Sequence, residues 1–474
     1  GYLCCIGSRV RYRVRLFAVC DERMKQLGAS PGPRKGQTSS ICEAEYGNYF
    51  VATYPPFSQW TADAVTEYSG MIDRPTAPEE EQALGLYVHI PFCVDRCRYC
   101  YYLAYGRGDR CNLDHYVDAL ISEFGFYAGC PATVDRALNF VYFGGGTPSL
   151  LARSSLERLF EGLQKTQSWA GACEVTFECA PKSVTPAKMD LLRQGGVTRL
   201  SLGVQQLDDE VLARNGRVHL IKDVEAAYDA VRQTGFPVVN LDLMVGLVGE
   251  TRESMQRSLD RVIELGPDSV TVYQMEIPFN TPLYCDLQSG AEAKDGLANW
   301  AEKRERVILA FQNLAQAGYE SISAYAMVKD RSKHDFVYQR EQYHGADLLG
   351  IGASSFSYIQ GLHHQNATTL SQYSDLVQAG QLPLLRAYRL DAGERLVREF
   401  VLQLKLGRLR RGYFLDKFDV DVLEQFCVPL EQLAEVGWVV WDDEELKLTE
   451  QGLPRVDHII PSFYQPPHRG VRYS

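Results

Sequence analysis

The sequence contains no uninterrupted apolar run close to the roughly 20 residues that a membrane-spanning helix needs. It also has no basic excess: 49 Lys and Arg stand against 60 Asp and Glu, and the formal net charge is −11. A general nucleic-acid binder usually presents a basic face, so this balance argues against nucleic acid as a partner. Residues 1–20 contain four arginines and lack the apolar core of a signal peptide. We therefore expect a cytoplasmic protein without a membrane or nucleic-acid partner.

The sequence also lacks a disulfide framework. Its 13 cysteines are odd in number and spread over 474 residues, whereas secreted disulfide scaffolds are short and dense in cysteine. Three of them nevertheless lie together in IPFCVDRCRYCYYLAY (90–105), at Cys93, Cys97 and Cys100. Structural zinc usually takes four ligands, whereas three thiolates without a neighbouring fourth suit a 4Fe–4S cluster with one open iron. The spacing favours the cluster, with a zinc site and a purely structural role as the alternatives.

Short apolar runs alternate with stretches of helical period from residue 84 onward. This alternation is typical of parallel strands joined by right-handed crossovers. Six units are too few for a closed eight-stranded barrel, so we predict an α/β fold with an open, partial (β/α)6 barrel. Functional groups should gather at the carboxyl ends of its strands. The expected strands are 84–90, 138–143, 173–178, 198–203, 237–244 and 269–276, and the expected helices include 113–127, 153–164, 221–235 and 252–266.

The pattern changes after about residue 280. We expect a long helix over 295–317, and then helices followed by a β-hairpin that turns at 442–445. Such an order suggests a small winged-helix-like α+β domain, although its acidic excess argues against DNA binding. The predicted organisation is a disordered extension (1–40), an amino-terminal segment or lid (41–83), the partial barrel (84–290), a barrel-completing or linker region (291–390) and the carboxy-terminal domain (391–474).

Two further groups of residues follow the predicted strands. GGGTPS (144–149) comes directly after the second strand, and its glycines would let backbone groups approach a ligand closely. A simple tight turn is the alternative, and the G-x-G-x-x-G spacing of dinucleotide-binding loops is missing. Polar residues also stand at strand ends or inside apolar strands, where burial costs free energy unless they are paired. Their convergence at one end of a barrel would favour a binding site; they are Glu178, Gln205, Arg217 and Asp242.

Together these motifs resemble the radical S-adenosylmethionine (radical SAM) superfamily. Within it they are similar to the branch of the oxygen-independent coproporphyrinogen III oxidases, with their haem-chaperone relatives and the class C methyltransferases and cyclopropanases. The resemblance covers about residues 84–455 and is carried by YVHIPFC-x3-C-x2-C, GGGTPS, FECAP, RLSLGVQ, NLDLMVGL and DLLGIGASSFS. It implies a 4Fe–4S cluster on Cys93, Cys97 and Cys100, whose open iron binds one SAM. Reduction would cleave that SAM to a 5′-deoxyadenosyl radical.

The same resemblance implies two SAM sites and further partners. Tyr87, Gly145 and Glu178 match positions that bind the first SAM. The implied partners are a small-molecule substrate and an electron donor such as flavodoxin or ferredoxin. Relatives bind a second SAM, and its contacts match Tyr99, Gly146, Thr147, Gln205, Arg217, Asp242, Met275 and Phe356.

Two features guide the choice of reaction within this branch. The oxidases carry a further cysteine two positions after the third cluster ligand, where this chain has Tyr102. The haem chaperones also lack that cysteine, but they usually begin close to the first strand, whereas here the segment 46–65 precedes it. Its stretch YPPFSQW predicts either a packed turn or a lid over substrate.

We therefore expect methyl or methylene transfer to an sp2 carbon of a small molecule. The reaction would be C-methylation or cyclopropanation in natural-product biosynthesis, with a methyltransferase or other biosynthetic enzyme as a partner. The alternatives are oxidative decarboxylation of coproporphyrinogen III and a haem chaperone. His344, His363 and His364 would be the haem ligands to consider for a chaperone, although structural histidines are the simpler interpretation.

Overall fold

The computed structural model of the chain describes residues 49–76, 82–106, 113–290 and 296–471. The extension expected over 1–40 lies outside these ranges, as do parts of the regions 41–83 and 291–390. In the described ranges, no helix combines the length and the apolar composition that a membrane crossing requires.

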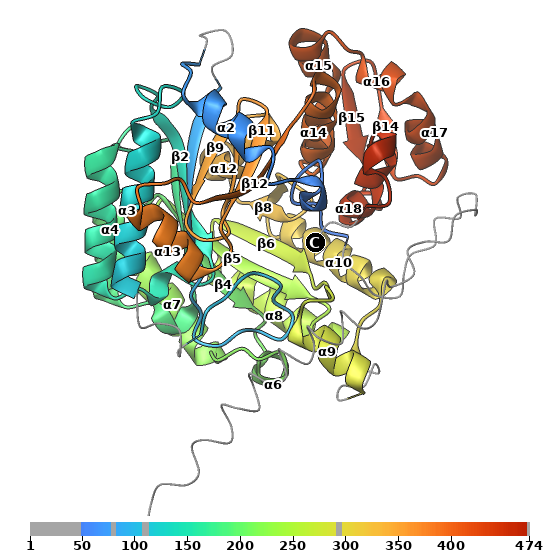
Figure 1. Ribbon diagram of the computed structural model, residues 1–474. Coiled ribbons are helices and arrows are strands. Elements are labelled where there is room, and N and C mark those ends of the chain that lie inside the picture. Colours follow the sequence, from blue (N-terminus) through green and yellow to red (C-terminus); the bar gives the residue numbers. More distant parts are fainter. Residues whose placement is uncertain (1–48, 77–81, 107–112, 291–295, 472–474) are drawn as a thin grey trace, which may run out of the picture.

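The body is one sheet of 12 strands in the order β12-β11-β10-β9-β1-β2-β3-β4-β5-β6-β8-β7 (Figure 1). The central strands, from β9 through β1 to β6, run parallel, and antiparallel strands continue the sheet at both edges. The α/β partial-barrel prediction is thus confirmed. The strands are β1 (Leu84–Ile90), β2 (Leu138–Gly145), β3 (Glu174–Cys179), β4 (Arg199–Gln205), β5 (Val238–Val245), β6 (Ser269–Gln274), β7 (Glu320–Ser321), β8 (Ala326–Val328), β9 (Asp347–Ile351), β10 (Phe356–Ile359), β11 (Leu362–Asn366) and β12 (Leu384–Arg389).

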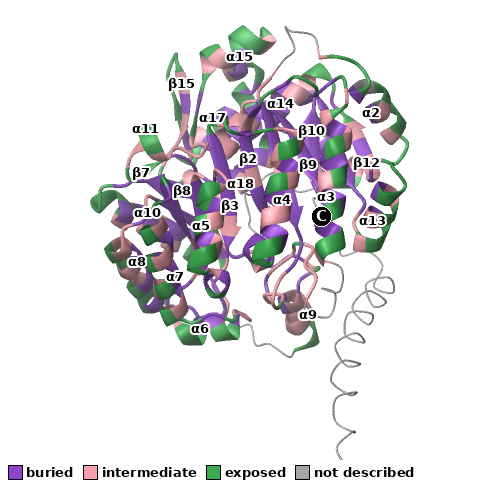
Figure 2. Ribbon diagram, turned by 90° about the vertical axis from the view of Figure 1, so that its left-hand side faces the viewer, coloured by how far each residue is buried: buried purple, intermediate pink, exposed green. Residues whose placement is uncertain are grey.

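Helices lie on the outer side of this curved sheet, and their buried faces point at the strands (Figure 2). Each crossover between successive parallel strands from β1 to β6 contains at least one helix, as the alternating pattern predicts. The helices of the body are α2 (Val65–Ile72), α3 (Leu113–Ala128), α4 (Arg153–Thr166), α5 (Pro186–Gln194), α6 (Asp209–Arg214), α7 (Ile221–Thr234), α8 (Arg252–Leu265), α9 (Pro282–Ser289), α10 (Trp300–Gln316), α11 (Arg331–His334), α12 (Val337–Tyr343) and α13 (Leu370–Gln378).

Helix α8 illustrates how the sequence sets these boundaries. Thr251 caps its amino end, because the threonine hydroxyl accepts the backbone N–H of Ser254 at 3.1 Å. Gly266 ends it in the left-handed conformation, with φ +66°, which glycine adopts without strain. Between these ends Met255, Leu259 and Val262 share one buried face, as residues spaced by three and four positions do on a helix.

A smaller carboxy-terminal domain follows β12 and lies beside the sheet at the upper right of Figure 1. Its three-stranded sheet contains the expected hairpin, which turns where the N–H of Asp442 donates to the carbonyl of Glu445 at 3.0 Å. Its elements are α14 (Ala392–Leu404), β13 (Arg408–Arg410), α15 (Arg411–Phe418), α16 (Val422–Gln425), α17 (Cys427–Glu435), β14 (Val439–Trp441), β15 (Glu445–Leu448) and α18 (Val456–Ile459).

The segment 49–61 packs between the barrel and this carboxy-terminal domain. Val51 and Tyr54 are fully buried and belong to the domain's apolar core. Trp60 stacks on the ring of His363 from β11, with ring centroids 4.8 Å apart. The YPPFSQW stretch is therefore part of a packed interface that fixes the two units together.

Candidate functional site

The cysteine loop follows β1 at the carboxyl end of the parallel sheet. The loop closes on its own base, because the N–H of Cys93 donates to the carbonyl of Tyr105 at 3.0 Å. A turn within it is held by the bond from the N–H of Cys100 to the carbonyl of Cys97 at 3.2 Å. The three thiols are half-buried and free of disulfides. One loop thus presents all three sulfurs at the edge where a parallel α/β fold places its ligands.

The donor set of this loop fits an iron–sulfur cluster better than a zinc ion. Within the described residues, no three Cys, His, Asp or Glu side chains are close enough together to bind one metal ion. A 4Fe–4S cluster instead takes each thiolate on a separate iron. Burial raises the pKa of Cys93, and it raises the pKa of Cys100 to about 12. Both thiols therefore keep their protons at neutral pH until a metal replaces them.

Two neighbours donate to these sulfurs. A guanidinium N–H of Arg217 lies 3.3 Å from the sulfur of Cys97, and the hydroxyl of Thr147 lies 3.7 Å from the sulfur of Cys93. Hydrogen bonds to cluster sulfurs tune the reduction potential. The structure thus joins two residues predicted as SAM contacts to the cysteine loop itself.

The glycine loop presses directly against the cysteine loop. The N–H of Gly146 donates to the carbonyl of Ile90 at 2.9 Å, and the N–H of Thr147 donates to the carbonyl of Phe92 at 2.8 Å. A Cβ on Gly146 would lie 2.7 Å from the carbonyl oxygen of Phe92. Gly145 has φ +112°, a backbone conformation that favours glycine. The glycines are therefore needed for the close approach of the two loops, and the ligand-cradle interpretation stays a prediction.

Glu178, near the end of β3, is bonded to this glycine loop. It accepts the hydroxyl of Tyr142 at 2.6 Å and the N–H of Gly145 at 3.2 Å. Burial raises its pKa to about 7, and the nearby charge of Asp242 adds to the rise. Glu178 has no cationic partner among the described residues, and the amino group of SAM would supply one.

Gln205 and Arg217 carry buried polar atoms that no described residue satisfies. Gln205 Oε1 and Arg217 Nε have no hydrogen-bond partner in the described part of the chain. Gln205 also has φ +68°, at a register shift where β4 bulges against β5. Such strain is typical of binding sites, and a bulge re-aims a side chain. Both observations are what a ligand contact at these positions predicts.

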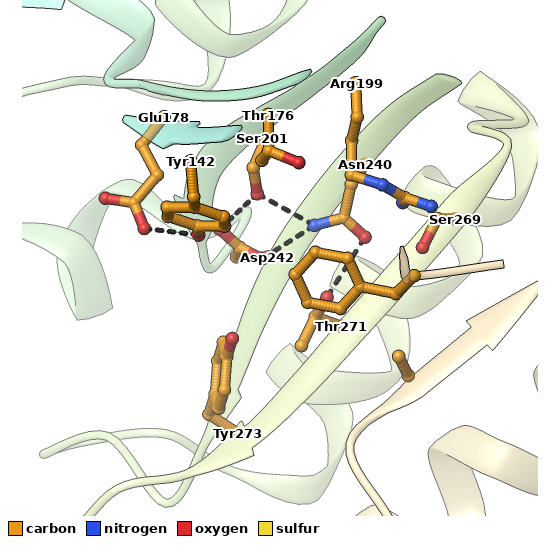
Figure 3. A pocket seen from close by; sticks show the side chains of 12 residues that line it. Tyr142, Thr176, Glu178, Arg199, Ser201, Asn240, Asp242, Ser269, Thr271 and Tyr273 are labelled. Carbon is orange, nitrogen blue, oxygen red and sulfur yellow. Dashed lines mark hydrogen bonds between the residues drawn. The ribbon is translucent and has the colours of Figure 1, made fainter. Parts of the chain in front are cut away.

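Asp242 lies deeper inside the barrel, in a polar network. It accepts the hydroxyl of Ser201 at 3.0 Å and the side-chain amide of Asn240 at 2.8 Å. Burial raises its pKa to about 6. A cavity of about 40 Å³ adjoins it, with room for about three water molecules. Figure 3 shows its lining, which is Tyr142, Thr176, Glu178, Arg199, Ser201, Asn240, Asp242, Ser269, Thr271, Tyr273, Ala326 and Phe336.

The other residues predicted as SAM contacts lie in three places. Tyr99 and Met275 pack in one small apolar cluster beside the cysteine loop. Tyr87 stacks on Tyr142 with centroids 5.8 Å apart, close to Glu178. Phe356 instead stacks on Phe57, with centroids 4.3 Å apart, and thus packs the amino-terminal segment.

Sequence reasoning missed the residues that surround these groups. Tyr142, Ser201 and Asn240 hold Glu178 and Asp242 in place. Ser201 and Asn240 lie within the motifs RLSLGVQ and NLDLMVGL, but neither was singled out as a site residue. A signal was present, because Asn240 and Asp242 are two residues apart on β5 and so share one face of the sheet. The same alternation also aims Thr271 of β6 into the network.

The histidines considered as haem ligands have structural partners. His363 is buried, and its Nε2 lies 3.2 Å from the hydroxyl of Thr53. His364 is fully buried beside the hydroxyl of Tyr127 at 3.1 Å. The Nδ1 of His344 lies 2.8 Å from the carbonyl of Arg340. These contacts favour the structural interpretation of all three.

Comparisons with known proteins agree with the geometry. Residues 87–262 match the family model of the radical SAM superfamily. The heme chaperone HemW of Bacillus subtilis is 30% identical over 380 residues, which are 80% of this chain and 98% of the chaperone. The oxygen-independent coproporphyrinogen III oxidase of Pseudomonas aeruginosa is 29% identical over 410 residues, 82% of this chain and 88% of the oxidase. The solved coproporphyrinogen III oxidase HemN of Escherichia coli, a radical SAM enzyme, superposes with a TM-score of 0.75 and 27% identity, over 87% of this chain and 96% of that chain.

These comparisons overturn the prediction of methyl or methylene transfer. The proteins that match most of the chain are named as coproporphyrinogen oxidases and haem chaperones. That prediction gave decisive weight to Tyr102, a single half-exposed position on a loop. Loop residues of this kind vary with the substrate, whereas the cluster ligands and the barrel are common to the family. The chain belongs to the radical SAM superfamily, in the branch that contains the oxygen-independent coproporphyrinogen III oxidases and the haem chaperones.

Proposed function

We propose that this chain is a radical SAM oxidase that acts on a side chain of a tetrapyrrole, as the coproporphyrinogen III oxidases do. The observation that carries the proposal is the extent of the likeness to the solved oxidase. The likeness covers 87% of this chain. Residues 84–474 make up a smaller share of the chain, so the match must include part of the segment upstream of residue 84. That segment is built into the interface between the barrel and the carboxy-terminal domain. The upstream segment resembles that of the oxidase and has a structural role. This supports an oxidase over a haem chaperone, because the chaperones usually begin close to β1.

The family uses a 4Fe–4S cluster and SAM, which together supply a carbon-centred radical that abstracts a hydrogen atom from the substrate. In this chain Cys93, Cys97 and Cys100 would hold the cluster. Glu178 would pair with the amino group of the first SAM, and the backbone of Gly145 would lie against its methionine part.

A second SAM would take the unsatisfied polar groups deeper along the same edge. Gln205 Oε1 and Arg217 Nε would bind its amino acid part, since both are buried and have no partner in the described residues. Asp242 would accept its ribose hydroxyls, beside the hydroxyl of Ser201. The electron would come from a small carrier such as flavodoxin or ferredoxin.

Anaerobic turnover tests the proposal. The protein with its reconstituted cluster is incubated with SAM, a reductant and coproporphyrinogen III, and the products are analysed by mass spectrometry. The expected products are 5′-deoxyadenosine and a tetrapyrrole whose propionate side chains have lost carbon dioxide. The Cys97→Ala variant should form neither product. SAM cleavage that leaves coproporphyrinogen intact, at saturating substrate, would contradict the proposal.

A haem chaperone is the second candidate. It is favoured by the 98% coverage of the Bacillus subtilis chaperone and by Tyr102, which stands where the oxidases carry a cysteine. This function predicts stable binding of haem and its transfer to an apoprotein, without turnover of SAM. Because His363 and His364 are buried and engaged, replacing them should not remove haem specifically. Haem transfer by the purified protein, with no product in the turnover assay, would favour this candidate.

A further inference from the structure

The barrel cavity has a buried polar floor beneath Asp242. Ser201, Asn240 and Thr271 are buried and form this floor, and they line the cavity together with Asp242 (Figure 3). On β5, Asn240 is 4% exposed, whereas Asp242, two positions further on the same face, is partly exposed. On β6 the exposed fraction rises in the same direction, from 9% at Thr271 to 38% at Tyr273. Asp242 therefore lies between the floor and the carboxyl ends of the strands.

The floor forms one chain of hydrogen bonds that ends on Asp242. The side-chain amide of Asn240 donates to Asp242 Oδ1 at 2.8 Å and to Ser201 Oγ at 2.9 Å. The hydroxyl of Ser201 donates to Asp242 Oδ2 at 3.0 Å. The hydroxyl of Thr271 donates to the amide oxygen of Asn240 at 3.0 Å, as Figure 3 shows. Both oxygens of the carboxylate thus accept a bond from the floor.

The charge of Asp242 fixes the direction of each bond in this chain. An ionised carboxylate only accepts hydrogen bonds, so Asn240 must turn its NH₂ group towards Asp242. Its amide oxygen then faces Thr271, whose hydroxyl has to donate. Ser201 accepts from the same amide, which leaves its own proton for Asp242. Reversing Asn240 would bring an amide oxygen against the carboxylate at a cost in free energy, so the floor has one favoured arrangement.

The floor also affects the charge of Asp242. Burial raises the pKa of Asp242 to about 6, whereas hydrogen bonds from the floor lower it. The floor therefore opposes the effect of burial and keeps Asp242 ionised at neutral pH, the form that accepts hydroxyl groups more strongly. The other charged or titratable groups around the cavity are Tyr142 on β2, Glu178 on β3, Arg199 on β4 with its partner Glu174, Tyr273 on β6, and Arg217 after α6.

We propose that Asn240 is a positioning residue for the second SAM, because it holds the carboxylate of Asp242 in the orientation that accepts the ribose hydroxyls. The second SAM belongs to the proposed function, on which this inference rests. Both ends of the Asn240 amide are bonded within the site, so Asn240 acts through Asp242 and does not itself contact the ligand. Thr271 supports it by fixing the orientation of the amide.

Equilibrium dialysis with labelled SAM tests the inference. The cluster-loaded protein is used anaerobically and without a reductant, so that SAM is bound but not cleaved. The amount bound per chain distinguishes one SAM from two, and Asp242→Asn identifies the second site as the one that it weakens. In the wild type, affinity for the second SAM should rise with pH through about pH 6, where Asp242 loses its proton, and then level off.

The Asn240→Leu variant keeps a similar side-chain volume but removes the NH₂ group. Its affinity for the second SAM should fall by about tenfold at pH 7, because Asp242 is both less well oriented and more often protonated. The deficit should shrink towards about pH 8.5, where the charge of Asp242 returns. Affinity for the first SAM should change by less than about twofold. A variant that only disturbed the fold would lose affinity at both sites and at every pH.

Two conservative changes at Thr271 test the same chain of bonds with less risk to the fold. Thr271→Val removes the hydroxyl that orients Asn240 and should weaken the second SAM by about threefold or more, again less at high pH. Thr271→Ser keeps a hydroxyl and should behave as the wild type. The matched control is Thr133→Val, because Thr133 is buried and bonded to the carbonyl of Tyr127 but does not line the cavity. It should leave both SAM affinities unchanged.

The inference is overturned if Asn240→Leu leaves the second SAM unaffected, or if the loss is equal at both sites or at every pH. A wild type that binds only one SAM would refute the second site and this inference with it. The oxidase reaction fails in a different way. A protein with the expected SAM binding that releases no carbon dioxide from coproporphyrinogen III would retain the inference and lose the proposed reaction.

Discussion

The buried carboxyl group of Glu178 lowers the free energy of unfolding when no SAM is bound, and this cost can be measured. Its pKa is raised to about 7 from 4.5, first by burial and further by the charge of Asp242. The native state thus binds a proton that the unfolded state has already released between these two values. The free energy of unfolding therefore falls as the pH rises through this window, and the full cost is present above about pH 7. For a shift of this size the cost is about 3 kcal/mol.

The Glu178→Gln variant should remove this cost. Its amide can accept the N–H of Gly145 and donate to the hydroxyl of Tyr142, so the local contacts survive the change. Without SAM, the variant should be more stable than the wild type, and its advantage should grow by about 2 kcal/mol between about pH 5.5 and about pH 8. SAM affinity should fall by about tenfold to hundredfold, because a charged pair is lost.

Denaturant unfolding at several pH values and equilibrium binding of SAM are the two measurements. Glu161→Gln makes the same charge change on the exposed face of α4 and should alter neither. An advantage of Glu178→Gln that stays constant with pH would refute the electrostatic cause. Unchanged SAM affinity would refute the role of Glu178 in binding SAM. The pH dependence of the stability difference would still report the burial of its carboxyl group.

Three further predictions concern packing and the cluster. Gly146→Ala places a Cβ 2.7 Å from the cysteine-loop backbone, so it should lower the free energy of unfolding by about 1–3 kcal/mol and weaken SAM binding. The control is Gly125→Ala on α3, whose Cβ meets no atom within 4 Å and which should be neutral or stabilising in thermal unfolding. Arg217→Lys cannot keep both guanidinium hydrogen bonds, one to the sulfur of Cys97 and one to the carbonyl of Gly203. Because hydrogen bonds to the sulfurs tune the reduction potential, a redox titration should find a lower cluster potential, and an unchanged potential would contradict this. Trp60→Ala empties a buried stacking site and should destabilise the protein by about 3–5 kcal/mol, whereas Trp441→Ala, 40% exposed, should cost less than about 1 kcal/mol.

The elements of the barrel could be predicted because their signal is local. Runs such as 84–90 are apolar and short, and the intervening helices repeat every three to four residues, so each boundary lies within a few positions of the observed one. The position of the site then follows from parallel topology alone, since carboxyl ends meet at one edge. The strand β9 was missed as an element, although DLLGIGASSFS was recognised as a motif. Five residues that pair with β1 from more than 250 positions away carry no periodic signal.

The finer geometry of the site depends on contacts that no sequence pattern encodes. Gln205 matches a family position, but its positive φ and the bulge of β4 arise only when β4 and β5 are aligned. Glu276, which follows β6, matches no recognised motif, and the backbone N–H groups of Tyr49 and Phe50 that it accepts lie 227 and 226 positions away. Long-range pairs of this kind are set by how the units pack. The amino-terminal segment illustrates the point, because its composition could not distinguish a lid from a packed turn.

Tyr102 shows why the reaction was harder to predict than the fold. Its difference from the oxidases was treated as evidence about the reaction, but an exposed loop residue beside the cysteine loop acts first on which molecule can approach. Tyr102 is two positions after Cys100, its ring stacks on that of Tyr101, and it is 48% exposed. A cysteine there would offer a small, reactive thiol, whereas a tyrosine offers an aromatic face and a hydroxyl. The substitution therefore changes the shape and the stacking surface presented to the substrate, while the cluster ligands stay the same. We therefore expect Tyr102 to affect the choice of substrate, and we expect the radical chemistry to depend on the cysteine loop, Glu178 and the barrel that holds them.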